Sequence, residues 1–239
     1  MVELKHVSFA YEPGKEVVRD LSFRLEDGES VGLIGANGAG KSTVMKLLLG
    51  LVQGEGEITV DGILLEKKSL AEIRRKIGFV LQNSDDQMFM PTVYDDMMFA
   101  PLNYGMTREE AEKKVDAVLS RLELGALKNR YNHKLSGGEK KMAAVATILA
   151  MEPEAVLMDE PTSGLDPYNR RLIIRTVCGM KETKLIASHD LDMILESCSR
   201  VILLSEGRIA ADGKAEEILR DRALLEANHL ELPLSFGRS

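Results

Sequence analysis

The sequence has no tryptophan, two cysteines, no long apolar run and no excess of basic residues. Cys178 and Cys198 lie apart without a CxxC spacing, so we expect reduced structural thiols rather than a disulfide framework or a thiolate metal site. The four histidines are scattered, which argues against a His-cluster metal site. A formal net charge of −7 argues against a dedicated nucleic-acid binder, because such proteins usually carry a basic surface.

No apolar stretch approaches the roughly 20 residues that span a bilayer. The first six residues also lack the apolar region of a signal peptide. We therefore expect a cytoplasmic chain whose membrane role, if any, is peripheral. The length of 239 residues and a 44% hydrophobic content suit one large α/β domain with a buried core, spanning residues 1–239.

Hydrophobic periodicity places the secondary structure. Alternation over the first 30 residues, interrupted by Gly14 and Gly28, predicts short antiparallel strands. Strands and helices then alternate, which predicts a mainly parallel sheet covered on both faces. Residues 231–239 are expected to be loosely ordered. The predicted strands are 30–34, 57–60, 77–81, 155–158, 184–187 and 200–204, and the predicted helices are 107–122 (with a capping box), 136–150, 167–180 and 191–197.

A glycine-rich run between a predicted strand and an apolar helix matches the P-loop pattern in full. Its glycines let backbone N–H groups approach phosphate, and the helix directs its positive end at the same anion. Lys41 is expected to reach the β- and γ-phosphates of ATP, and Ser42 to ligate Mg²⁺. A chance glycine turn is the alternative, and the flanking strand and helix disfavour it. The residues expected to bind nucleotide here are Gly35, Ala36, Asn37, Gly38, Ala39, Gly40, Lys41, Ser42 and Thr43.

Two adjacent acids end the apolar strand predicted at 155–158, as in a Walker B motif. Asp159 is expected to hold the Mg²⁺ shell, and Glu160 to polarise the attacking water as general base. An ordinary solvated turn is the alternative, which the P-loop in the same chain disfavours.

The run 135–141, Leu-Ser-Gly-Gly-Glu-Lys-Lys, lies 24 residues before Asp159 and opens a predicted helix. It resembles the signature sequence of ABC ATPases, and with the P-loop, the paired acids, a D-loop containing Asp166, and His189, the order of motifs is similar to that family over residues 2 to about 225. The resemblance implies a P-loop ATPase with an antiparallel β subdomain, an inserted helical subdomain at about 84–150 and a tail at about 225–239.

The start of the helix at 136 forms a second anion site that one P-loop does not need within the same chain. The resemblance implies that two such domains pack head to tail, and that Ser136, Gly137, Gly138 and Glu139 of each close over ATP bound to the other. In isolation the run would also fit a Ser-capped helix after a glycine turn.

Two positions depart from the family pattern. Glu139 stands where the family usually has Gln, and Met142 where Arg is common. An acid is tolerable at a helix N-terminus, and Lys140 and Lys141 follow it, so we do not expect Glu139 to inactivate the protein. Both departures bear on the hydrolysis rate rather than on the fold.

Three further roles come from the resemblance. His189 is similar to the switch histidine that contacts the γ-phosphate, although a lone His at a strand end is also common as a structural residue. Gln82 is similar to the Q-loop glutamine that senses Mg²⁺ and the attacking water. Tyr11 lies where the family stacks an aromatic ring on adenine, the alternative being that Phe9 or Tyr11 belongs to the core.

The segment after Gln82 resembles the Q-loop of ATPases from energy-coupling-factor importers, which take up vitamins and metals such as cobalt and nickel. Their typical Asn-Pro-Asp-Asp-Gln appears here as residues 83–87, with Ser84 in place of Pro. Five of the twelve methionines fall between Met88 and Met106. Met-rich surfaces adapt to inserted helices. We expect a socket for a coupling helix of a membrane subunit, the alternative being that these methionines fill a loosely packed core.

The expected function is that of an ATPase subunit at the cytoplasmic face of the membrane. Its expected partners are a second ATPase subunit, identical or paralogous, a transmembrane coupling protein and a substrate-binding membrane protein. Another ABC transporter such as an exporter is the alternative within transporters. A non-transport ABC ATPase would usually carry a coiled coil or two ATPase domains, and a small-molecule P-loop kinase would not need the signature run.

Overall fold

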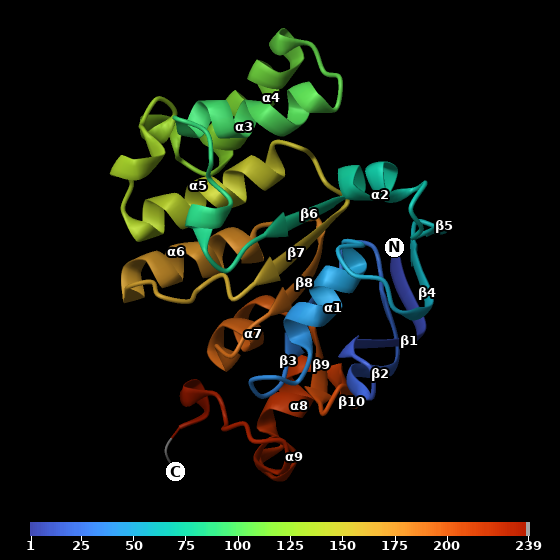
Figure 1. Ribbon diagram of the computed structural model, residues 1–239. Coiled ribbons are helices and arrows are strands. Elements are labelled where there is room, and N and C mark those ends of the chain that lie inside the picture. Colours follow the sequence, from blue (N-terminus) through green and yellow to red (C-terminus); the bar gives the residue numbers. More distant parts are fainter. Residues whose placement is uncertain (238–239) are drawn as a thin grey trace.

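The computed structural model describes residues 1–237, which form an antiparallel sheet, a larger mainly parallel sheet and the helices packed on them (Figure 1). The antiparallel sheet has the order β2-β1-β4-β5. Its first two strands pair over eleven residues each, longer than the short strands predicted, and turn at Gly14, whose φ of +79° suits glycine. The strands are β1 (Val2–Glu12), β2 (Lys15–Leu25), β4 (Glu55–Val60) and β5 (Ile63–Leu64).

The larger sheet has the order β10-β9-β3-β8-β7-β6, with parallel pairing everywhere except between β10 and β9. The predicted α/β architecture with a mainly parallel sheet is therefore confirmed. All predicted strands occur within two residues of their expected bounds. The strands of the larger sheet are β3 (Ser30–Ile34), β6 (Ile77–Val80), β7 (Ala155–Asp159), β8 (Thr183–Ala187), β9 (Arg200–Ser205) and β10 (Arg208–Lys214).

The four predicted helices are present, and both the Thr107 and the Ser136 capping boxes form. The helices α2, α3, α8 and α9 and the strands β5 and β10 have no counterpart among the predicted elements. The helices are α1 (Lys41–Leu48), α2 (Leu70–Lys76), α3 (Val93–Asn103), α4 (Arg108–Arg121), α5 (Gly137–Leu149), α6 (Pro167–Cys178), α7 (Leu191–Ser197), α8 (Ala215–Arg220) and α9 (Arg222–Ala227).

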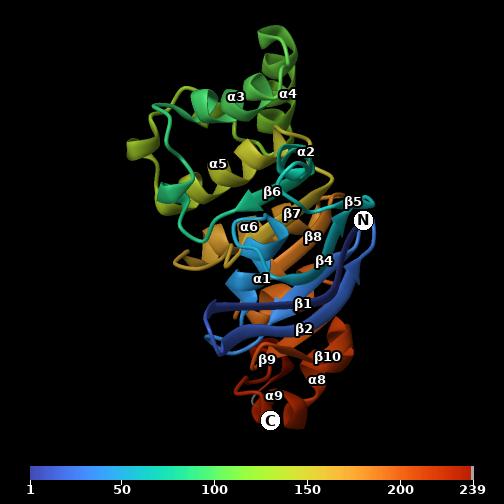
Figure 2. The ribbon, with the colours of Figure 1, turned by 45° about the vertical axis from the view of Figure 1, so that its right-hand side comes forward.

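Two apolar cores lie on opposite faces of the larger sheet. On one face, α1 is packed between the two sheets, with Met45 and Leu48 fully buried against strands of both. On the other face, α5, α6, α7 and α8 cover the sheet. Figures 1 and 2 show α3, α4 and α5 together at one end of the molecule and α8, α9 and the C-terminus at the other. Successive residues of β7, such as Leu157 and Met158, belong to opposite cores, as the pleat of a strand requires.

Two expectations need correction. Met97 and Met98 on α3, which packs against α4 and α5, are buried in the core together with Met88 from the preceding loop, so only part of the methionine-rich segment is surface. The segment 231–237 is not loose. Asp192 on α7 accepts the backbone N–H groups of Leu234 and Ser235, and Phe236 packs under Arg220. Residues 238–239 of the predicted loose tail lie outside the described residues.

Candidate functional site

Four loops meet at the carboxyl edge of the larger sheet. Strands β3, β8, β7 and β6 are neighbours in that order, so the loops that follow them lie side by side. These loops carry the glycine-rich run, His189, the two acids and Gln82, in that order across the sheet. Topology alone therefore brings together groups that are up to 154 residues apart in sequence, Gly35 and His189 being the extremes.

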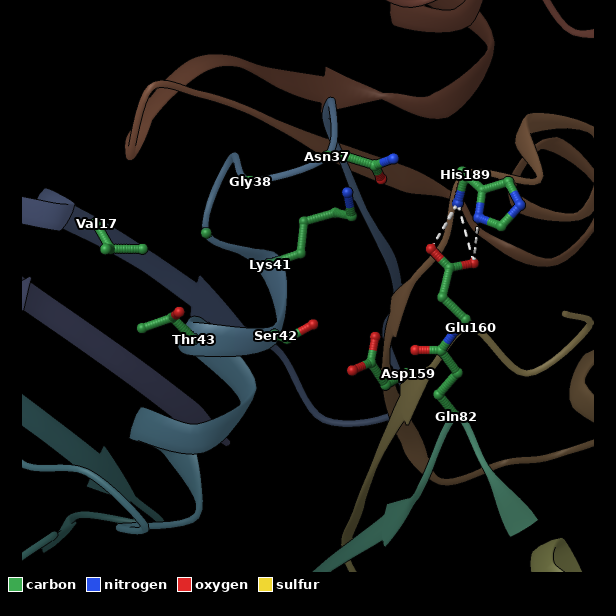
Figure 3. Close-up of a pocket in the computed structure, with 11 residues that line it drawn as sticks. Val17, Asn37, Gly38, Lys41, Ser42, Thr43, Gln82, Asp159, Glu160 and His189 are labelled. Carbon is green, nitrogen blue, oxygen red and sulfur yellow. Dashed lines mark hydrogen bonds and ion pairs between the residues drawn. The ribbon is translucent and has the colours of Figure 1, made fainter. Parts of the chain in front are cut away.

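A cavity of about 530 Å³ opens at this edge (Figure 3). Figure 3 shows the side chains of Lys41, Ser42 and Thr43 on one side of it, and those of Gln82, Asp159, Glu160 and His189 on the other. Tyr11, Ser136 and Asp166 do not line it. The lining residues are Val17, Asn37, Gly38, Gly40, Lys41, Ser42, Thr43, Gln82, Asp159, Glu160 and His189.

The glycine-rich run needs glycine for two physical reasons. Gly35, Gly38 and Gly40 have φ of 150°, 82° and 107°, which L side chains rarely adopt. A Cβ on Gly35 would lie 2.3 Å from the Leu204 carbonyl oxygen, and one on Gly40 would lie 2.9 Å from that of Val17. The loop is thereby pressed against β2 and β9, and Gly38 leaves open space on the cavity side.

Lys41 is buried at the floor of this loop. Its Nζ donates to the carbonyl oxygens of Gly35 at 2.6 Å and Ala36 at 3.1 Å. Burial lowers the pKa of Lys41, while the negative charges of Glu160 and Asp159 raise it. The same cavity therefore holds one buried cation facing two carboxylates.

Glu160 is held rigidly at the end of β7. Its φ of +46° is unusual for a non-glycine residue, and its backbone N–H donates to the Ala187 carbonyl at 2.8 Å. The carboxylate accepts the Ser188 hydroxyl at 3.0 Å and the His189 backbone N–H at 3.1 Å, and the His189 ring Nδ1 lies 2.8 Å from Oε2 (Figure 3). The expected general base and the expected switch histidine are thus in direct contact.

Asp159 and Ser42 line the same cavity. Burial raises the pKa of Asp159, and Glu160 adds to this, while Ser42 and the nearby lysines oppose it. Within residues 1–237, no cluster of three or more His, Cys, Asp or Glu side chains could hold a metal unaided. Ser42, Asp159 and Gln82 nevertheless offer oxygen donors only, which is the chemistry Mg²⁺ prefers when phosphate and water complete its shell.

The run 136–139 lies away from this cavity, on the first turn of α5. Ser136 accepts the Glu139 N–H, and Glu139 accepts the Ser136 N–H at 2.8 Å. The Glu139 carboxylate also receives Arg130 Nη1 at 2.7 Å, and the Ser136 N–H together with Arg130 lowers its pKa. The expectation that Lys140 and Lys141 offset this charge is wrong, because Arg130 does so.

The two lysines point elsewhere. Lys140 pairs with Asp85, and Lys141 donates to backbone carbonyls of the loop after β6. Met142 is buried between α5 and α6, where its sulfur accepts the Thr176 hydroxyl at 3.8 Å. An arginine at that position would have to bury its charge in the core.

Asp166 caps α6 by accepting the backbone N–H groups of Tyr168 and Asn169. The Asn169 side chain, bonded in turn to Asp166, lies against Gly138, where an added Cβ would come within 2.1 Å of it. Tyr11 is exposed on β1, stands edge-on to Phe9, and has its hydroxyl 3.4 Å from Thr43 Oγ1. Tyr11 is therefore not a core residue, and its exposed ring has Lys46 Nζ 5.8 Å from its centre.

Sequence reasoning missed several residues that shape the site. Val17 lines the cavity from β2, Ser188 holds Glu160, and Arg170 pairs with Asp190 next to His189, the expected switch histidine. Ser188 and Asp190 flank His189 in the sequence, and this adjacency was a signal that could have identified them. Val17 and Arg170 carry no sequence signal of their role.

Comparison with known proteins agrees with the motifs. The family model described as "ABC transporter" matches residues 18–163, more than half of the chain. The chain belongs to the ABC transporter family. Members of this family are ATPases coupled to transport, and the protein is an ABC transporter ATPase subunit. Within residues 1–237, no helix has both the length and the apolar character needed to cross a membrane.

Three matches illustrate the likeness. The energy-coupling factor transporter ATP-binding protein EcfA of Methanothermobacter thermautotrophicus is 42% identical over 239 residues, covering 98% of this chain and 77% of that protein. The solved structure of cbiO1 from Clostridium perfringens, described as part of the ABC transporter complex cbiONQ, superposes with a TM-score of 0.86 at 31% identity, covering 95% and 93% of the two chains. The ATP-binding cassette MJ0796, solved as a dimer bound to ADP and Pi, gives a TM-score of 0.79 at 29% identity, covering 90% and 99%.

Proposed function

We propose that the protein powers an importer of the energy-coupling-factor type, taking up a vitamin or a transition metal ion such as cobalt or nickel through separate membrane subunits. Hydrolysis is supported chiefly by one observation, the placement of Glu160 and His189 opposite Lys41 and Ser42 in one cavity. The importer type is supported by the likeness to EcfA and cbiO1 and by the run 83–87.

In this mechanism the P-loop amides and Lys41 bind the β- and γ-phosphates of ATP, and Tyr11 stacks on the adenine. Ser42, Asp159 and Gln82 would hold Mg²⁺, which when bound would neutralise phosphate charge. Glu160 accepts the proton of the attacking water. Glu160 is bonded to the backbone and the ring of His189. Contact of that ring with the γ-phosphate would therefore change the position or charge environment of the Glu160 carboxylate.

A second subunit completes the site. Ser136, Gly137, Gly138, Glu139 and Asp166 lie outside the cavity of their own chain. We propose that they close over the nucleotide of a partner ATPase subunit in a head-to-tail dimer. The dimeric structure of MJ0796 supports the pairing of two such subunits.

The membrane subunit is proposed to dock on the exposed part of the segment after Gln82. Phe89 and Phe99 are 63% and 42% exposed and meet edge to face at 4.9 Å. Beside them, a cleft of about 200 Å³ is lined by Met90 and Met98 among others. An aromatic pair and flexible thioethers next to a cleft suit insertion of an apolar helix face.

The docking proposal is tested by changing Phe99 and Met90 to Ser together. These residues are partly exposed, so the affinity for ATP and the melting temperature should stay unchanged. The membrane partner should no longer be recovered on affinity purification. Met97→Ser is the matched comparison, since Met97 is fully buried and its change should destabilise the fold. Retention of the partner by the Phe99/Met90 variant would contradict docking at this surface.

The function is tested by affinity purification of Glu160→Gln with ATP from gently solubilised membranes, followed by mass spectrometry. This variant should retain ATP, lose turnover and accumulate as a closed dimer. Recovery of a transmembrane coupling protein with a small substrate-binding membrane protein is the expected result. Recovery of transport subunits of another type would refute the importer class, and full turnover by the variant would exclude Glu160 as base.

A further inference from the structure

Helix α5 is bound to the loop after β6 by three polar side chains. Lys140 pairs with Asp85 at the surface. Gln87 accepts the Leu81 N–H at 3.0 Å and donates to the Ala144 carbonyl at 2.7 Å and to Thr147. Lys141 donates to the loop backbone from inside the protein. The loop is therefore fixed to α5 as well as to its own strand.

Lys141 is the most buried of these three side chains, with 2% of its surface exposed. Its Nζ donates to the Leu81 carbonyl at 3.1 Å and to the Gln82 carbonyl at 2.6 Å. A buried ammonium is costly unless it is hydrogen-bonded, and an apolar residue would pack here without that cost. The nucleotide mechanism above does not use this charge.

These hydrogen bonds converge on the backbone of Leu81 and Gln82, and the Gln82 side chain lines the cavity. The Leu81 N–H donates to Gln87 of the same loop, which is itself bonded to Ala144 of α5, and the Leu81 carbonyl accepts from Lys141 on α5. The Gln82 carbonyl is bonded to Lys141 directly. The position of Gln82 therefore depends on α5. Residues 137–139 lie on the first turn of the same helix, within about one turn of Lys141 at about 1.5 Å rise per residue.

We propose that Lys141 is a positioning residue that holds Gln82 at the cavity and ties it to the signature end of α5. The inference rests on the proposed function, since it assigns Gln82 a part in placing Mg²⁺ and water. It predicts an effect on turnover rather than on nucleotide binding, because the P-loop lies on the other side of the cavity.

The test is steady-state Mg-ATP hydrolysis by the full chain. Lys141→Met keeps the apolar stem and removes the donor. We expect kcat to fall about 10- to 100-fold, the cost of misplacing a reacting-site group, while KM changes by less than about threefold. Lys141→Arg, which can donate to both carbonyls, should recover most of the loss. Lys140→Met, which breaks only the surface pair with Asp85, should stay within about twofold of wild type.

A double-mutant cycle separates positioning from general packing. If Lys141 acts through Gln82, then Lys141→Met should add almost nothing to the loss caused by Gln82→Ala. Losses that multiply, unchanged kcat in folded Lys141→Met, or failure of Lys141→Arg to recover activity would overturn the inference. Each kcat is normalised to the folded fraction from thermal melts, and if Lys141→Met does not fold, Lys141→Gln replaces it in the same cycle. Wild-type protein without ATPase activity would instead refute the proposed function.

Discussion

The pair between Arg170 on α6 and Asp190 at the start of α7 offers a quantitative test of how the site is held. Arg170 donates through Nε and Nη2 to the two oxygens of Asp190, each at 2.6 Å. Asp190 also accepts the Thr162 hydroxyl and the Met193 N–H, both at 3.0 Å. The carboxylate of Asp190, the residue after His189, thus joins the start of α7 to helix α6 and to the segment after Glu160.

The magnitude follows from geometry and exposure. Removing one partner of a fully buried pair costs about 3–5 kcal/mol, because the other charge is left without compensation. The side chains of Arg170 and Asp190 are 29% and 17% exposed, so solvent relieves part of this cost. We expect Arg170→Met to lower the free energy of unfolding by about 2–3 kcal/mol. For a chain of this size the melting temperature should then fall by about 4–12 °C.

The adjacent residue supplies a matched control. Arg171 on the same helix pairs with Glu196 of α7, but these side chains are 48% and 38% exposed. Exposed pairs contribute little, so Arg171→Met should change the free energy of unfolding by less than about 1 kcal/mol. Both variants are compared by urea unfolding and by ATPase assay well below the melting temperature. Only Arg170→Met should also lower kcat, by about tenfold, because Asp190 adjoins His189.

The pH dependence adds a second readout. Burial raises the pKa of Asp190, but Arg170, the Met193 N–H and Thr162 outweigh it, so the pKa lies below its ordinary value of 3.8. A depressed carboxyl pKa stabilises the fold above the unfolded value and loses that effect as pH falls through the folded value. The stability difference between wild type and Arg170→Met should be constant from about pH 5 to 8 and shrink only below about pH 4. Equal effects of the Arg170 and Arg171 changes, or a gap that closes near neutral pH, would refute this reasoning.

Three further outcomes are expected. Glu139→Ala should cost about 1 kcal/mol in urea unfolding through loss of the capping box, whereas Glu139→Gln, which keeps the box, should cost a few tenths; equal costs would contradict the capping role. Gly138→Ala should destabilise the fold by about 1–3 kcal/mol because its Cβ meets the Asn169 side chain, while Gly137→Ala, whose Cβ would meet open space, should be neutral or stabilise the fold by up to about 1 kcal/mol because alanine favours a helix over glycine. Asp192→Ala should make the C-terminal segment a faster target of limited proteolysis with the core intact, and an unchanged cleavage rate would show that Asp192 does not hold it.

Much of the site was predictable because its chemistry demands particular residues over a short stretch. A loop pressed against β9 needs glycine at 35, and a phosphate-facing helix start needs its lysine, whatever the rest of the chain does. The helix at 107 was predicted from its capping box, a local hydrogen-bond pattern, and the helix at 136 followed a glycine turn with Ser136 as a possible cap. The central strands were apolar runs between turns, since both faces of the sheet are covered.

Elements whose structure depends on their neighbours escaped prediction. Helix α3 is apolar on several sides and contains Pro101, so no clear helical period was visible. Strand β10 alternates exposed and half-buried small or charged residues, and its identity as a strand comes from pairing with β9. The methionines near residue 97 were interpreted by composition, which gives no information on the face of the helix that each one occupies.

The same distinction separates the residues proposed to perform the chemistry from those that hold them in place. Lys41, Asp159 and Glu160 belong to motifs because the proposed hydrolysis requires their functional groups, and the topology of parallel strands collects them at one edge. Lys141 and Arg170 are ordinary lysine and arginine residues, and only the folded structure shows that each bonds to a loop next to the cavity. Because neither lines the cavity, their loss should impair turnover more than nucleotide binding, a kinetic signature that motif residues of the P-loop cannot give.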